Sequence, residues 1–279
     1  NVVNFFGGRF LRAGARLHGC DKATKDAFAV MDMAGYNYGI ARYKHDLKKY
    51  SNRIIVGSET FCADEREFYK MAKENPRIVG DFVWAGMDYL GEVGVGSWVP
   101  KDHSDGIMDG SCGWMTAGSG RVDFIGDETC EALYTKVALE KTPIEIGVVP
   151  HKYLKMKHSV SSWKMSMALH SWSFEGEEEK TCRVEVYSIG ETVQLFLNQK
   201  KIKQAKTKKN GRNIFKVKYQ PGELKAVSLD SNGNKLGEVI LKSASKENAL
   251  TIKPESNEIS KDELAFVRLS FTDTNGEIK

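Results

Sequence analysis

Apolar and polar residues follow two different periods along this chain, and the period changes near residue 144. In residues 1–143, short continuous apolar runs are separated by segments with helical periodicity. This arrangement is typical of parallel strands joined by crossover helices, because parallel strands are buried on both faces. From residue 144 onward, short alternating segments are separated by turn residues, which predicts antiparallel strands.

Three strand–helix units are expected in the first part. The predicted strands are 27–39, 53–59 and 77–92, the last with its exit loop, and the predicted helices are 40–51, 64–76 and 127–141. Asp64 is a candidate N-cap for the second of these helices. A closed (β/α)₈ barrel needs eight such units and about 250 residues. The pattern alone therefore allows either part of a barrel or a smaller doubly wound sheet.

The second part predicts an immunoglobulin-like β-sandwich over residues 144–245. Its alternating segments are 182–188, 192–198, 214–219, 223–230 and 235–242. Trp163 and Trp172 lie beside alternating apolar residues, so we expect them in the sandwich core, although they could form a sugar platform instead. Residues 246–279 contain two more strands, and two strands cannot bury themselves. We interpret this segment as the truncated start of a further domain.

Composition and charge exclude several classes of function. The net charge is +4 with 28% charged residues, so no strong field for nucleic acid is expected. The basic run 200–218 is interpreted as a solvated hairpin. The longest apolar runs are far too short to span a membrane. Five cysteines without a CxxC pair and six scattered histidines predict no disulfide framework, no metal site and no cofactor.

Polar and aromatic residues follow the three predicted strands, where parallel α/β folds carry their sites. Asn37 and Tyr38 end the first strand, Glu59 the second and Trp84 the third. An indole stacks on the C–H face of a sugar, and a carboxylate stabilises the positive charge of a glycosidase transition state. The set points to a carbohydrate substrate. Each residue also has a structural alternative. Glu59 could form an ion pair, Asn37 and Tyr38 could close a loop, and Trp84 could pack in the core.

Three motifs carry a family resemblance. "DMAGYNYGIARY", "RIIVGSET" and "GDFVWAGMDYLGE" resemble the last three barrel strands of glycoside hydrolase family 2, in the family's order and spacing. Bacterial β-galactosidases, β-glucuronidases and β-mannosidases belong to this family. The segment from Ile144 resembles the accessory β domain of long β-galactosidase-like members, and the tail resembles a bacterial Ig-like domain. The resemblance therefore implies that residues 1–143 are the C-terminal part of a TIM barrel.

The resemblance also implies the roles of the strand-end residues. Glu59 matches the catalytic nucleophile of a retaining, double-displacement mechanism. Tyr38 matches the tyrosine that hydrogen-bonds the nucleophile, and Trp84 matches the indole that shapes the sugar subsite. Asn37 is a candidate substrate contact. Asp88 and Glu92 match the same motif and are expected to support the exit loop, with a chemical role as the alternative.

The second carboxyl of this mechanism is missing from the expected place. A retaining glycosidase needs an acid/base besides its nucleophile, and in the family it is a Glu after an Asn, upstream of the nucleophile. No such pair precedes Glu59, and Asn257–Glu258 lies in the tail. The resemblance thus implies a C-terminal fragment that needs the N-terminal part of its chain and is inactive alone. No signal-peptide pattern begins the sequence, so the compartment stays open.

The substrate and assembly are further expectations. Loop 93–124 lacks the Asn-x-Lys pair with which family glucuronidases hold a carboxylate, which favours a neutral sugar. The accessory-domain arrangement resembles galactosidase-like members, so a terminal β-D-galactoside is expected, with a β-glucuronide or β-mannoside as alternatives. Residues that could line the mouth of the site, or merely pack the loop, are Trp98, His103, Asp105, Asp109 and Trp114. Three strands would leave an open sheet edge, so pairing with a second copy is an alternative to a longer chain. A non-catalytic carbohydrate-binding protein is the competing class of function.

Overall fold

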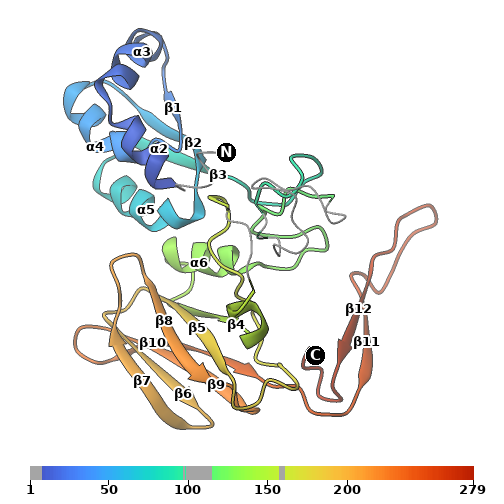
Figure 1. The fold of residues 1–279 in the computed structure, drawn as a ribbon. Coiled ribbons are helices and arrows are strands. Elements are labelled where there is room, and N and C mark those ends of the chain that lie inside the picture. The colour runs from blue at the N-terminus through green and yellow to red at the C-terminus, as the bar shows by residue number, and fades with distance from the viewer. Residues whose placement is uncertain (1–7, 97, 99–114, 157–160) are drawn as a thin grey trace. The chain divides into compact units, whose positions relative to one another are not determined.

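The computed structural model describes residues 8–96, 98, 115–156 and 161–279. These residues form two units, each with its own core (Figure 1). The first unit contains the chain up to Pro143 together with 155–167 and 208–212. The second contains Ile144–Leu154, Ala168–Thr207 and Asn213–Lys279. The chain therefore passes from the first unit into the second and returns to the first twice.

The first unit is a parallel sheet with crossover helices, as the apolar pattern predicted. Its elements in chain order are α2 (Gly8–Ala15), α3 (His18–Ala29), β1 (Ala34–Asn37), α4 (Ile40–Lys49), β2 (Ile55–Thr60), the 3₁₀ turn η1 (Cys62–Asp64), α5 (Glu65–Glu74), β3 (Ile78–Val83) and α6 (Cys130–Ala138). The strand order is β1-β2-β3, and both pairs are parallel. All three strands therefore end at the same edge of the sheet.

One face of this sheet packs on α4 and α5. Tyr36, Ile55 and Ile78 point to that face and are buried with helix residues such as Leu47 and Phe68. Each aliphatic side chain buried there contributes about 1.5–3 kcal/mol. On β3, in contrast, Phe82 is 67% exposed. The described part of the first unit thus leaves apolar side chains of its sheet uncovered.

Two local predictions for the first unit were wrong. The first strand is only Ala34–Asn37, because residues 27–29 end helix α3 instead of beginning the strand. A short apolar run cannot be assigned by its period alone, and the polar, alanine-containing sequence before it favours a helix. Asp64 precedes α5 but its side chain makes no capping hydrogen bond. It pairs with Arg12 of α2, so an ion pair replaces the cap.

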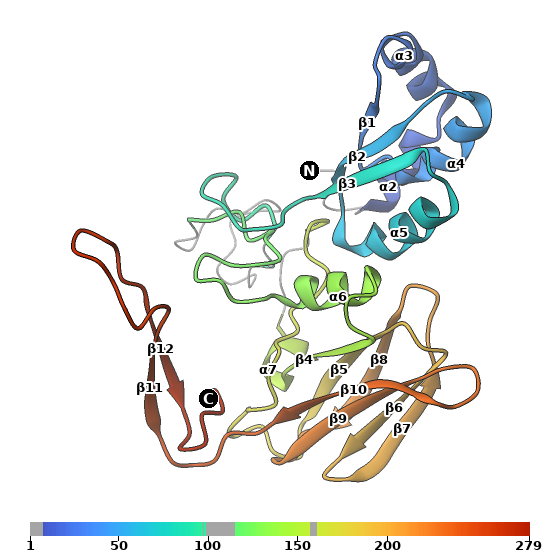
Figure 2. The ribbon, with the colours of Figure 1, turned by 180° about the vertical axis from the view of Figure 1, so that it is seen from behind.

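The second unit is a seven-stranded β-sandwich with its core between two sheets. Its elements are β4 (Ile144–Val149), α7 (His151–Leu154), β5 (Thr181–Ser188), β6 (Thr192–Leu197), β7 (Lys200–Lys206), β8 (Arg212–Lys218), β9 (Glu223–Leu229) and β10 (Lys235–Lys242). One sheet has the order β4-β5-β8, and the other, seen in Figure 2, has the order β10-β9-β6-β7. Apolar side chains of both sheets, among them Val186 and Leu195, form the core around the fully buried Trp172. The predicted sandwich and the core position of Trp172 are confirmed.

The basic run is not a hairpin. Its two strands, β7 and β8, lie in different sheets of the sandwich. The hairpin lies one strand earlier, where Asn198 and Gln199 connect β6 to β7 with φ values of 48° and 68°. Two consecutive left-handed residues match the right-handed twist of the strands they connect. The lysines that we took for a hairpin signal are therefore only the exposed residues of two separate strands.

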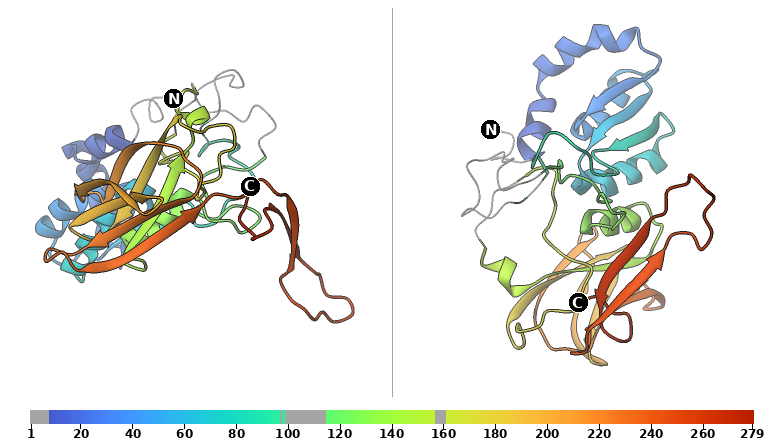
Figure 3. Two further views of the ribbon diagram at one scale, coloured as in Figure 1. Left: turned by 90° about the horizontal axis from the view of Figure 1, so that it is seen from below. Right: turned by 90° about the vertical axis from the view of Figure 1, so that its right-hand side faces the viewer.

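The tail forms the two expected strands, β11 (Ala249–Pro254) and β12 (Val267–Thr272), which pair as an antiparallel ribbon (Figure 3). Leu250 lies opposite Phe271, and their side chains are 63% and 57% exposed. That these strands belong to a further domain stays a prediction. Among the described residues, no helix is long and apolar enough to cross a membrane.

Candidate active site

Tyr38 and Glu59 meet where β1 and β2 end. Asn37 lies opposite Glu59 in the strand register, and the Tyr38 amide donates to the Glu59 carbonyl oxygen over 2.7 Å. Tyr38 has a φ of 53°, a left-handed conformation that is uncommon for a residue with a side chain. The next residue must be small, because a Cβ at Gly39 would lie 2.9 Å from Tyr36 Cβ. The "YNYG" sequence thus turns the chain sharply at the strand end.

The side chain of Tyr38 is enclosed by aromatic rings. It stacks on Phe61 with a centroid distance of 4.1 Å, and the Trp163 indole Nε1 donates to its hydroxyl oxygen over 2.7 Å. Burial raises the pKa of Tyr38 well above its usual value; the bond from Trp163 opposes the rise, and the hydrogen bond to the Glu59 carboxylate adds to it. Tyr38 therefore keeps its proton at neutral pH, with the Glu59 carboxylate as its neighbour.

Asn37 presents an amide at the same edge. Its Oδ1 accepts a hydrogen bond from the Ser58 hydroxyl over 2.7 Å, and the residue is exposed. This bond fixes the orientation of the amide, so its NH₂ group is the side that can donate to a ligand. The geometry suits contact with a hydroxyl group.

Trp84 follows β3 and is held by its backbone and its indole. The Trp84 amide donates to the Thr60 carbonyl oxygen over 3.2 Å, and the indole Nε1 donates to the Tyr89 hydroxyl over 3.1 Å. Tyr89 in turn donates to Glu92. Burial and the neighbouring Glu92 raise the pKa of Tyr89 to about 12. The indole is therefore oriented by a phenol that stays protonated.

A buried carboxyl, Asp81, supports the end of β2 from the helix side. The Thr60 hydroxyl donates to Asp81 Oδ1 over 2.5 Å, one residue after Glu59. Only a glycine fits at position 57, since a Cβ there would lie 2.2 Å from Asp81 Oδ1. Burial raises the pKa of Asp81 to about 6.

The structure brings Asn37, Tyr38 and Glu59 together and places Trp84 at the next strand end. Sequence reasoning missed Phe61, Tyr89 and Trp163 as their neighbours. Tyr89 stood inside a quoted motif and could have been found there. Trp163 was assigned to the sandwich core, which is wrong: it belongs to the first unit and carried no local signal.

The predicted loop residues have different outcomes. Asp88 accepts a hydrogen bond from the Gly118 amide over 2.9 Å, which is the loop contact expected of it. His103, Asp105, Asp109 and Trp114 lie outside the described residues. Within the described residues, no three His, Cys, Asp or Glu side chains are arranged to hold a metal ion.

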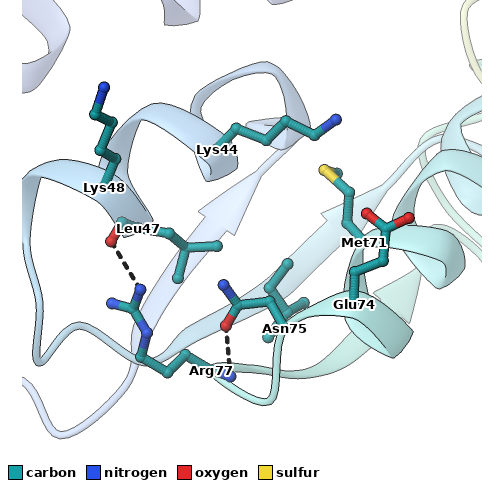
Figure 4. Close-up of a pocket in the computed structure, with 8 residues that line it drawn as sticks. Lys44, Leu47, Lys48, Met71, Glu74, Asn75 and Arg77 are labelled. Atoms are coloured by element: carbon teal, nitrogen blue, oxygen red, sulfur yellow. Dashed lines mark hydrogen bonds between the residues drawn. The ribbon is translucent and has the colours of Figure 1, made fainter.

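A pocket at the opposite edge of the parallel sheet contains none of the predicted site residues (Figure 4). It lies between the C-terminal ends of α4 and α5, beside the start of β3. Its Arg77 donates to the Leu47 carbonyl oxygen over 2.7 Å, and Asn75 Oδ1 accepts from the Arg77 amide over 3.0 Å. Arg77 therefore satisfies a helix end, and the strand-end carboxylate at the other edge remains the stronger candidate for chemistry.

Comparison with known proteins shows which proteins this chain is similar to. Residues 179–237 match the family described as "Domain of unknown function (DUF4982)". The chain is 24% identical over 217 residues to Beta-galactosidase BoGH2A of Bacteroides ovatus, covering 76% of this chain and 21% of that protein. A solved glycosyl hydrolase family 2 member from Bacteroides cellulosilyticus has a TM-score of 0.79 at 28% identity, over 92% of this chain and 33% of the other. A β-glycosidase from Bacteroides vulgatus shares the fold, with a TM-score of 0.58 at 16% identity, over 89% of this chain and 36% of the other.

These matches show that the chain is similar in sequence and fold to glycoside hydrolases. The solved relatives from Bacteroides cellulosilyticus are members of glycoside hydrolase family 2, the family that the three strand-end motifs of this chain resemble. The chain spans 21% of the length of the curated relative and 33% of the first solved one.

Proposed function

We propose that this chain carries one half of the active site of a retaining β-galactosidase, with Glu59 as the nucleophile. The observation that carries this proposal is the position of Glu59 at the end of a parallel strand, beside Tyr38, a phenol that keeps its proton. In the first step, the carboxylate would attack the anomeric carbon while an acid protonates the leaving oxygen. In the second step, water would attack the glycosyl-enzyme and release the sugar with its β configuration retained.

The neighbouring side chains suit the other roles of such a site. Tyr38 keeps its proton and would donate it to Glu59, which would hold the carboxylate in one orientation. The amide of Asn37 is oriented by Ser58 and is exposed, so it can donate to a sugar hydroxyl. Trp84 offers an indole face for the apolar side of the sugar ring, and Tyr89 fixes its orientation.

We assign the parallel sheet to the last three strands of a (β/α)₈ barrel, residues 144–245 to an accessory sandwich, and residues 246–279 to a further Ig-like domain. The acid/base would come from a part of the polypeptide outside this chain. A retaining mechanism needs that second carboxyl about 5–5.5 Å from the nucleophile, and no Asn-Glu pair precedes Glu59. The 279 residues alone are therefore expected to be inactive.

A β-galactoside is the sugar that the matches favour, since the curated relative is named a β-galactosidase. A β-glucuronide and a β-mannoside remain the alternatives to compare. A sugar platform on the sandwich tryptophans is disfavoured. Trp172 is fully buried and donates its indole proton to the Gln220 carbonyl oxygen, and Trp163 belongs to the first unit.

Glu59→Gln in the full-length hydrolase tests the proposal. Turnover of aryl β-galactosides should fall by at least about a thousandfold, which corresponds to roughly 4 kcal/mol of transition-state stabilisation. Glu74→Gln at the opposite edge is the matched control and should keep normal turnover. A 2-deoxy-2-fluorogalactoside should label Glu59 in the unmutated enzyme, as read by peptide mass spectrometry. Normal turnover of Glu59→Gln, or a label on another residue, would refute the assignment.

A further inference from the structure

The segment 161–166 brings a tryptophan from beyond β4 back to the strand ends of the first unit. The Trp163 ring meets Tyr38 and Phe61 edge-on, with centroid distances of 6.0 Å and 5.7 Å. Its indole Nε1 donates to the Tyr38 hydroxyl over 2.7 Å. In the described part of the chain, the Trp163 indole bonds to Tyr38 and not to Glu59, so a role in the reaction would have to pass through Tyr38.

The segment is anchored before Trp163. The Ser161 hydroxyl donates to the Val95 carbonyl oxygen over 2.6 Å and accepts from the Trp163 amide over 3.1 Å. Ser161 is itself buried. These two bonds fix the backbone at the tryptophan against the loop that follows Trp84.

A buried carboxylate anchors the segment after Trp163. Glu131, in the first turn of α6, accepts from the Met165 and Ser166 amides over 2.7 and 3.2 Å, and Lys164 Nζ lies 3.6 Å from its other oxygen. Burial opposes ionisation of Glu131, but Lys164 and the amides outweigh it and lower its pKa. Hydrogen bonds and an ion pair thus fix the backbone on both sides of Trp163, in a clamp that holds its indole in one orientation.

An indole N–H can only donate a hydrogen bond, whereas a phenol can donate and accept. When Trp163 donates to the Tyr38 oxygen, the phenol's own proton is left for another acceptor. Glu59, whose carbonyl oxygen accepts from the Tyr38 amide over 2.7 Å, is the neighbouring carboxylate. We propose that Trp163 is a positioning residue that directs the Tyr38 hydroxyl proton onto the nucleophile. This inference rests on the proposed function of Glu59 and adds to it a residue from beyond the barrel segment.

The hydrogen bond itself can be tested without turnover. In the ¹⁵N-labelled 279-residue chain, the indole N–H cross-peak of Trp163 is identified by its loss in Trp163→Phe. Tyr38→Phe should shift that cross-peak by several tenths of a ppm in the proton dimension. The Trp172 cross-peak, whose indole donates to a backbone carbonyl, should stay in place. An unmoved Trp163 cross-peak would overturn the proposal.

The positioning role is tested by a double-mutant cycle in the full-length hydrolase. Trp163→Phe keeps an aromatic ring but loses the donor, and it should lower kcat by about tenfold while KM changes less than twofold. In a Tyr38→Phe background, the same substitution should change kcat less than twofold, because the hydroxyl it acts on is gone. Trp172→Phe, which removes a comparable indole hydrogen bond in the sandwich, should have the same effect in both backgrounds.

The outcomes separate the two proposals. Equal effects of Trp163→Phe with and without the Tyr38 hydroxyl would mean a structural role and would overturn the inference. If the unmutated hydrolase turned over no β-glycoside, the proposed function would fail, and the positioning role with it, even with the cross-peak shifted. If the enzyme is active and the effects of Trp163→Phe and Tyr38→Phe on kcat are additive, the proposed function stands and only the positioning role of Trp163 is refuted.

Discussion

The Thr60 hydroxyl donates to the buried carboxyl of Asp81 over 2.5 Å, and this bond joins β2 to β3 one residue beyond Glu59. The pair lies on the face of the sheet that carries Gly57, where a side chain would collide with Asp81. The position of Glu59 therefore depends on a neighbour, Thr60, that is hydrogen-bonded to a titrating carboxyl. Two predictions follow from this contact.

The stability of the first unit should rise as the pH falls from 8 to 5. Burial raises the pKa of Asp81 to about 6, above its value in the unfolded chain near 3.8. The protonated form is thus favoured by folding. Its stabilising contribution is complete below the unfolded pKa and is lost as the pH rises through about 6. Asp81→Asn should remove this pH dependence and raise Tm at pH 8 by about 2–4 °C. Thermal unfolding of the wild type and of Asp81→Asn at pH 5 and at pH 8 measures this. If Tm changes by the same amount with pH in both proteins, the prediction is wrong.

Gly57→Ala should disturb the same contact by steric means. Its Cβ would lie 2.2 Å from Asp81 Oδ1 and 2.9 Å from Thr60 Oγ1, so both side chains must move. We expect a loss of about 1–3 kcal/mol in the free energy of unfolding, with a drop in kcat because Glu59 lies two residues away. Gly80→Ala is the control, since its Cβ would meet nothing closer than Val56 Cγ2 at 3.9 Å. Equal stability of the two variants in urea would show that the site tolerates the methyl group.

The sequence predicted what depends on neighbours along the chain. The apolar run of β2 ends at Glu59 within one motif, and α4 reads as a helix from the spacing of Ile40, Tyr43 and Leu47, which are all buried against the sheet. The sequence did not predict the features that depend on contacts between residues far apart along the chain. Residues 27–29 were predicted to begin β1 but belong to α3. Strands β7 and β8 were predicted to pair but lie in different sheets of the sandwich. Trp163 reaches its partner 125 positions away, a relation that no local period records.

Tyr38→Phe should lower kcat in the full-length hydrolase. It removes the proposed donor to the Glu59 carboxylate, and hydrogen bonds to charged groups contribute about 1.5–3 kcal/mol, so kcat should fall roughly 10- to 150-fold. It also leaves the Trp163 indole N–H without its acceptor, so some loss of stability is expected as well. Tyr36→Phe, two residues earlier, is the matched control. It removes a bond to the Asp46 carboxylate of 2.7 Å on the helix side of the sheet. The control should lower Tm and leave kcat unchanged at 25 °C, and the reverse result would show that the two tyrosines had been assigned the wrong roles.

The clamp on Trp163 should depend on the charge balance of Glu131 and Lys164. Glu131 is buried and Lys164 is 23% exposed, so removing the carboxylate leaves an ammonium group with little solvent. Glu131→Gln should therefore cost about 3 kcal/mol of stability and shift the Trp163 indole cross-peak. The double variant Glu131→Gln, Lys164→Met removes both charges, while the glutamine oxygen can still accept from Met165 and Ser166. Its stability should recover most of the loss, because a buried ion pair replaced as a whole is often neutral. Unfolding in urea gives the two free energies. A double variant as unstable as Glu131→Gln would mean that the unpaired charge of Lys164 does not cause the loss, and that the ion pair plays no part in holding Trp163 against Tyr38.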